Sequence, residues 1–166
     1  MRFEERPSHE IEARIEAPPE QVWPVVTDLP RFGEWSPENR GGVWLDAGGP
    51  VLGARFRGRQ EHRAVGEWET TSTVTECDPP KRFGWVVGPS AEEAGASWSF
   101  ELVPEGGGTL VRFRAVMGPG PSGTTAAIER MPDKEERIIE RRLQEWDAGM
   151  RAVLDGIRAH VEAAGR

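Results

Sequence analysis

The residues that could support acid–base or metal chemistry are few and lie far apart in the sequence. The three histidines, His9, His62 and His160, form no H-x-x-x-H pair and no cysteine cluster accompanies them. Because a protein metal site needs several nitrogen, sulfur or oxygen ligands brought together, no metal is expected. His62 falls in a predicted hairpin loop, where it is either simply solvated, which we favour, or a proton-transfer group at a cavity mouth.

No cysteine or serine in the sequence has the surroundings typical of a catalytic nucleophile. Cys77 stands beside Asp78, whose negative charge disfavours the reactive thiolate, so we expect a structural role. None of the serines, including Ser36, Ser72 and Ser97, sits in a nucleophile-elbow pattern. The sequence therefore identifies no catalytic residue.

Gly118, Gly120 and Gly123 match the G-x-G-x-x-G spacing of dinucleotide-binding loops. However, Pro119 and Pro121 remove backbone N–H donors from the loop, and no strand follows to complete a βαβ unit. We therefore predict a rigid loop that gates a cavity, and no cofactor.

Arg55, Arg57 and Arg59 alternate with Phe56 and Gly58 along one predicted strand. The arginines either form an exposed basic stripe or point inward, where they could hold a carboxylate or enolate oxygen. Burying three unpaired charges is costly, so exposure is the favoured interpretation.

Composition narrows the class of protein. The 166 residues fit a single domain, 1–166. The 21 basic and 28 acidic residues give a net charge of -7, which disfavours nucleic acid as a partner. The single cysteine permits no internal disulfide, which favours a reducing, cytoplasmic compartment. The charged N-terminus and short apolar runs predict neither a signal peptide nor a membrane anchor.

Seven tryptophans, with no tyrosine, predict a large aromatic core or the wall of an apolar site.

Periodicity predicts an α+β chain. A strand at 9–15 alternates apolar and polar residues, a helix opens at Pro18-Pro19, and a short second helix or turn covers 31–37 before a glycine-rich loop at 41–53. Turn residues at 78–81 and 105–108 then predict hairpins in an antiparallel meander. The six further strands are expected at 43–46, 54–60, 68–77, 82–87, 96–103 and 109–117.

A long C-terminal helix is expected from a capping box at Asp133 and Glu136 to about His160. Gly149 and Gly156 flank its apolar face, and each costs the helix up to ~1 kcal/mol relative to alanine. Close packing against the sheet or space for a ligand could offset that cost, and we favour packing. The apolar positions keep a three-four spacing: Ile139, Leu143, Trp146, Met150, Val153, Ile157 and Val161.

Four segments together resemble a known family. They are 17–23 (APPEQVW) with Asp28 and Trp35-Ser36-Pro37; 53–56 (GARF); 74–85 (VTECDPPKRFGW); and 108–111 (GTLV). The chain resembles the START and Bet v 1-like (SRPBCC) superfamily, and within it the polyketide cyclase/dehydrase and lipid-transport group. This resemblance implies a helix-grip fold, in which a curved seven-stranded antiparallel sheet wraps around a long C-terminal helix and two short helices follow the first strand. It also implies an apolar cavity between sheet and helix, but no catalytic motif transfers to this sequence.

Strand parity predicts which side chains face that cavity. The inward set runs through Trp68 to Val74, Phe83 to Val87, Trp98 to Leu102 and Val111 to Ala115, taking every second residue. We expect ligand contacts from a mainly aromatic subset together with helix and loop residues. They are Trp35, Phe56, Gln60, Trp68, Thr70, Trp85, Trp98, Met131, Leu143 and Trp146.

Three functions stay open. The first is binding of a small hydrophobic or aromatic molecule in an internal cavity, by a monomer or homodimer that is not stably anchored to a membrane. The second is a polyketide cyclase/aromatase, which would need an inward group able to move a proton. The third is a protein-partner module like the chaperone activators, which would show an exposed apolar patch.

Overall fold

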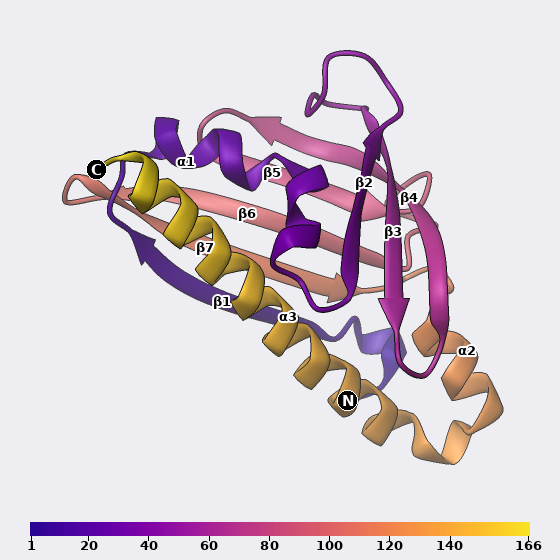
Figure 1. Ribbon diagram of the computed structural model, residues 1–166. Helices are drawn as coiled ribbons and strands as arrows, with labels where there is room; N and C mark the ends of the chain where they lie inside the picture. The colour runs from indigo at the N-terminus through magenta and orange to yellow at the C-terminus, as the bar shows by residue number, and fades with distance from the viewer.

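The computed structural model describes residues 1–166 and consists of one sheet crossed by one long helix (Figure 1). All neighbouring strands are antiparallel, in the order β1-β7-β6-β5-β4-β3-β2, so the meander from β2 to β7 closes on β1. This is the predicted helix-grip architecture. The strands are β1 (Ser8–Ile15), β2 (Asn39–Trp44), β3 (Arg55–His62), β4 (Gly66–Asp78), β5 (Arg82–Val87), β6 (Ala96–Glu105) and β7 (Gly108–Met117).

Helix α3 (Glu135–Ala164) lies diagonally across the concave side of the sheet (Figure 1). Its buried side chains follow the predicted apolar seam, including Ile139, Trp146, Met150 and Ile157. The shorter helices are α1 (Pro19–Val26) and α2 (Gly123–Arg130), and 3-10 turns occupy Phe3–Glu5, Leu29–Glu34 and Pro132–Lys134. None of the helices combines the length and the apolar composition needed to cross a bilayer.

The tight turns follow from glycine. Gly106 and Gly107 have φ values of 53° and 85° and join β6 to β7 in two residues. Positive φ at both central positions is the geometry that matches the right-handed twist of a hairpin. The two strands remain in register from Glu105 opposite Gly108 to Ala96 opposite Met117.

The core lies between the sheet and the helices, and strand parity was predicted correctly. Ser72 and Val74 are buried while Thr71 and Thr75 are exposed, and the same alternation continues into β6 and β7. The aromatic members pack closely, with the ring centroids of Phe100 and Phe113 4.1 Å apart. Thr109, which is fully buried, donates its hydroxyl to the Ala17 carbonyl at 2.7 Å and so ties β7 to the segment before α1.

Three predicted boundaries were wrong. Strand β2 covers 39–44 rather than 43–46, because Gly42 fits against the Arg57 carbonyl where any Cβ would overlap it and because an irregularity shifts the register between Asn39 and Gly42. Helix α3 begins at Glu135 after a 3-10 turn, with no side-chain cap, since Glu136 pairs with the amino group of Met1 instead of closing a capping box with Asp133. The ladder between β3 and β4 runs on to His62 opposite Gly66, so His62 ends a strand instead of lying in a loop.

Candidate ligand-binding site

An aromatic contact joins the middle of α3 to the sheet. The ring of Trp146, from α3, lies 4.9 Å from that of Trp98, from β6, measured between centroids. Trp98 also contacts Phe113 of β7 at 5.9 Å, and Trp85 of β5 contacts Phe100 at 6.1 Å. Four of the side chains predicted to face inward therefore form a continuous aromatic wall with Trp146.

Burial along this inward face is uneven. On β4, Ser72 and Val74 are buried, whereas Trp68 and Thr70, on the same face, are only half-buried. Gln60, which pairs with Trp68 across β3 and β4, is also half-buried. Trp98 is half-buried while the next inward residues of β6 are buried. We call the region around Gln60, Trp68, Thr70 and Trp98 the open end of the inward face.

Several hydrogen-bond donors at the open end and in the aromatic wall lack protein partners. Thr70 donates its hydroxyl to Gln60 Oε1 at 3.2 Å, which leaves the Gln60 amide N–H groups free. No protein acceptor takes the indole N–H of Trp98 or Trp146. No fully buried side-chain nitrogen or oxygen lacks a partner, so none of these donors is completely enclosed by protein.

The two glycines of α3 have opposite surroundings. A Cβ at Gly156 would overlap the ring of Trp35, so this position meets the expectation of close packing. A Cβ at Gly149 would meet no atom within 4 Å, and there the expectation was wrong. Gly149 follows Arg142 and Glu145 at helical spacing, on the flank of α3 that faces β2 and β3. Space therefore lies beside α3 on this flank.

Four charged or ionisable side chains link that flank of α3 to β2 and β3, and we call them the clasp: Glu38, His62, Arg142 and Glu145. Arg142 donates from Nη2 to Glu38 Oε1 at 2.6 Å and from Nη1 to Glu38 Oε2 at 2.9 Å. Nη1 also donates to Glu145 Oε1 at 3.0 Å, and Glu145 Oε2 lies 3.0 Å from His62 Nε2. All four side chains are partly buried.

The preferred solvated interpretation of His62 was therefore wrong. The Ala64 backbone N–H donates to His62 Nδ1 at 3.0 Å, so the neutral ring carries its proton on Nε2 and donates it to Glu145. Both ring nitrogens are thus engaged. The signal in the sequence is limited to Arg142 and Glu145 lying three residues apart beside an apolar seam, because Glu38 and His62 join them only through the fold.

The clasp changes the pKa values of Glu145 and Arg142. Burial raises the pKa of Glu145, but hydrogen bonds from His62 and Arg142 outweigh burial, so its pKa is lower than usual. Burial likewise works against the charge of Arg142, and its carboxylate partners still raise its pKa. The lowered pKa of Glu145 and the raised pKa of Arg142 both favour the charged forms of this pair.

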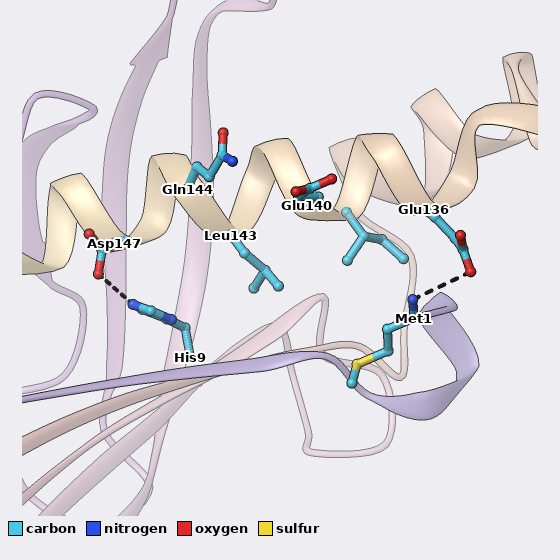
Figure 2. A pocket seen from close by; sticks show the side chains of 8 residues that line it. Met1, His9, Glu136, Glu140, Leu143, Gln144 and Asp147 are labelled. Atoms are coloured by element: carbon cyan, nitrogen blue, oxygen red, sulfur yellow. Dashed lines mark hydrogen bonds and ion pairs between the residues drawn. The ribbon is translucent and has the colours of Figure 1, made fainter.

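Leu143 lies elsewhere. It lines a groove of about 550 Å³ on the opposite flank of α3, together with Ile139, His9 and Asp147 (Figure 2). Figure 2 shows the His9 ring pointing at Asp147, with Nε2 and Oδ1 2.6 Å apart. Leu143 is therefore separated from the predicted residues at the open end.

Three other residues predicted to contact the ligand, Phe56, Trp35 and Met131, lie in three different parts of the molecule. Phe56 packs edge-on against Trp44 at 5.4 Å near the β2 edge, and Trp35 packs on Gly156 in the C-terminal half of α3. Met131 ends α2 and is 39% exposed. The structure thus brings Gln60, Trp68 and Thr70 together and Trp85, Trp98 and Trp146 into the aromatic wall.

Other candidate groups lie outside this site. Arg55, Arg57 and Arg59 are exposed as predicted, and Arg55 pairs with Asp46 at 3.1 Å. No cluster of three or more His, Cys, Asp or Glu side chains could hold a metal ion. Burial and the neighbouring Asp78 raise the pKa of the Cys77 thiol, which disfavours a reactive thiolate.

Comparison with solved structures shows the same architecture in several proteins. A Polyketide_cyc-like protein from Corynebacterium glutamicum is 30% identical, with a TM-score of 0.69 over 96% of this chain and 93% of its own. The di-domain aromatase/cyclase BexL, from the BE-7585A biosynthetic pathway, is 18% identical, with a TM-score of 0.73 over 95% of this chain and 50% of its own. Ara h 8.0201 is 13% identical, with a TM-score of 0.60 over 95% of this chain and 99% of its own.

A search of curated protein sequences gives no match. Residues 6–162 match the family described as polyketide cyclase / dehydrase and lipid transport. This match spans every strand and nearly all of α3, so it includes the aromatic wall, the open end and the clasp. The chain therefore belongs to the polyketide cyclase/dehydrase and lipid-transport family, with the helix-grip fold of the SRPBCC superfamily.

Proposed function

We propose that this protein binds an uncharged, apolar and at least partly aromatic molecule between the concave face of the sheet and α3, and that the molecule enters at the open end. The observation that carries the proposal is the uneven burial of one face. Trp68, Thr70, Gln60 and Trp98 share the parity of the core, yet they are only half-buried. Inward-facing tryptophan left partly uncovered is the surface that an apolar ligand would cover.

The donors at the open end and in the aromatic wall support a ligand with acceptor atoms such as carbonyl or ether oxygens. The indole N–H groups of Trp98 and Trp146 and the amide of Gln60 have no protein acceptor. No unpaired cation lies among the inward residues, because the guanidinium of Arg142 is shared by two carboxylates. Apolar burial at about 25 cal/mol per Å² would supply most of the affinity, and the donors would orient the ligand.

Catalysis of aldol cyclisation receives less support. Such a reaction needs a group that can accept a proton from a bound carbonyl compound. At the open end Gln60 and Thr70 do not titrate near neutral pH, and both nitrogens of His62 are already engaged. A cyclase would therefore have to act chiefly by holding its substrate in a reactive shape.

A protein-partner module also receives less support. The exposed large apolar side chains outside the termini are Val43, Val51, Leu52, Val65 and Met131. They belong to an edge strand, two separate connections and the end of α2. Exposed apolar residues scattered over separate segments are normal on protein surfaces and do not define a partner.

A thermal-shift screen tests the proposal. The panel contains neutral flavonoids and aromatic polyketides, sterols, and fatty acids as anionic comparators. A ligand at ~100 times its dissociation constant adds about 2.7 kcal/mol, which raises Tm by roughly 5 to 11 °C for a chain of this size. We expect this rise with neutral aromatic compounds. A rise with fatty acids alone would contradict the proposed ligand class, and no rise with any compound would contradict the site.

Filling the space beside Gly149 provides a test at the site itself. Gly149→Leu places a side chain where no atom lies within 4 Å of a Cβ, so affinity for a ligand found in the screen should fall at least about tenfold, or 1.4 kcal/mol. Ala148→Leu, at the exposed preceding position, is the matched control and should bind normally. Equal affinities of the two variants in calorimetry would show that the ligand does not use this space.

A further inference from the structure

We infer that the clasp of Glu38, His62, Arg142 and Glu145 is a gate that controls access to the open end. This inference rests on the proposed function, since it assigns the regulation of that same site. The clasp joins three segments that are distant in sequence. They are the residue before β2, the end of β3 and the N-terminal half of α3.

The position of the clasp is the first argument. Its residues on α3 are followed by Gly149, beside which the structure leaves open space, and then by Gly156, which Trp35 covers. On the sheet, His62 ends β3 two residues after Gln60. The clasp therefore crosses the interval between α3 and the β3–β4 hairpin at the half-buried end of the inward face.

The second argument is that nothing else polar holds this interval closed. His62 to Glu145 is the one hydrogen bond between α3 and either β3 or β4. The other polar contacts of α3 go elsewhere, with Asp147 bound to His9 of β1, Glu162 to the backbone before α1 and His160 to Arg31. Separation of α3 from the hairpin thus requires breaking the clasp and leaves those contacts in place.

The third argument is that the two contacts that the clasp makes from α3 reach the same part of the sheet. The Glu38 carbonyl accepts a hydrogen bond from the Glu61 backbone N–H at 2.8 Å, so Glu38 is fixed to β3 beside His62. Both attachment points of α3 therefore belong to one piece of the sheet. Loss of either contact, Arg142 to Glu38 or His62 to Glu145, weakens the same closure, and loss of Arg142 removes the first contact and one of the hydrogen bonds that position Glu145 for the second.

The test compares two flanks of one helix. Arg142→Met removes the shared cation, and Glu145→Gln removes one charge with almost no change in shape, which covers the case in which Arg142→Met fails to fold. Asp147→Asn is the matched control. It weakens a similar imidazole–carboxylate contact, between His9 and Asp147, on the flank that faces β1.

Two measurements separate the gate from the proposed function. The first is quenching of tryptophan fluorescence by acrylamide, which needs no ligand and reports access to all seven indoles, among them Trp68 and Trp98 of the open end. The second is stopped-flow association and dissociation of Nile red, a neutral aromatic ketone. With the clasp broken, we expect stronger quenching and association and dissociation rates that each rise about tenfold, so that Kd changes little. The control should match the wild type in both measurements.

Failure of the gate and failure of the proposed ligand class give different results. Unchanged quenching in both clasp variants, or an equal rise in Asp147→Asn, overturns the gate whether or not Nile red binds. Failure of Nile red to bind the wild type counts against the proposed ligand class. Quenching then still decides whether the clasp controls access to the open end.

Discussion

At the scale of single residues, the two glycines of α3 show that one residue type can serve opposite purposes in one helix. Gly156 makes room for the ring of Trp35, whereas Gly149 faces open space. Both glycines destabilise the helix because they lose more conformational entropy on folding than alanine would, but only at Gly156 does close packing offset that cost. Substitution by alanine should therefore have opposite effects at the two positions.

Gly149→Ala should raise the free energy of unfolding by up to ~1 kcal/mol, because alanine favours the helix and its Cβ meets no atom. Gly156→Ala should lower it by about 1 to 3 kcal/mol, because the Cβ overlaps Trp35 and forces it to move. Urea unfolding monitored by circular dichroism measures both values. Stabilisation by Gly156→Ala would show that Trp35 moves away freely.

The clasp carboxylate Glu145 predicts a dependence of stability on pH. Its pKa is lower in the folded protein, since hydrogen bonds from His62 and Arg142 outweigh the opposing effect of burial. A group with a depressed pKa stabilises the fold above its unfolded pKa, about 4.3 for a glutamate, and loses that contribution as the pH falls through the folded pKa.

The difference in unfolding free energy between wild type and Glu145→Gln should therefore be constant near neutral pH and shrink below a pH of about 4.3. Urea titrations at a series of pH values measure it. Asp147 also has a lowered pKa, through Arg151 and then His9, but its contribution is present in both proteins and cancels. A difference that grows toward acid pH would contradict the assigned hydrogen bonds.

At the scale of elements, β7 and the segment before α1 depend on one buried hydroxyl. Thr109 is fully buried and donates to the Ala17 carbonyl at 2.7 Å. Thr109→Val keeps the shape but leaves that carbonyl without its donor, so the free energy of unfolding should fall by about 1 to 3 kcal/mol. Thr71→Val, on the exposed face, is the control, and an equal loss in both variants would show that the loss does not come from the buried hydrogen bond.

The elements also show what could be predicted from the sequence. Alternation at Ser72 and Val74 and the three-four spacing from Ile139 to Ile157 report local periodicity, and they correctly predicted the sheet faces and the buried side of α3. The clasp could not be predicted in this way. His62 and Glu145 are 83 residues apart, and their contact depends on where the helix crosses the sheet.

For the molecule as a whole, stability should be distributed unevenly. Helix α2 has no fully buried side chain, whereas β6 and β7 pair along ten positions and contribute much of the aromatic core. Segments with few buried contacts open locally at lower free-energy cost. Native-state hydrogen exchange should therefore be fastest in α2 and slowest in β6 and β7, and equal protection of α2 would show that it is fixed as firmly as the core.

The irregular pairing of β2 has a consequence for how copies of this protein meet. A sheet of this kind ends in two edge strands, and an edge with regular free N–H and C=O groups can accept a strand from another chain. Strand β2 is short, and its register shifts between Asn39 and Gly42, with Gly41 at a φ of 84° and the charged side chain of Arg40 exposed. This edge offers no regular ladder to a second molecule, so the bulge makes the addition of another chain's strand at β2 unfavourable.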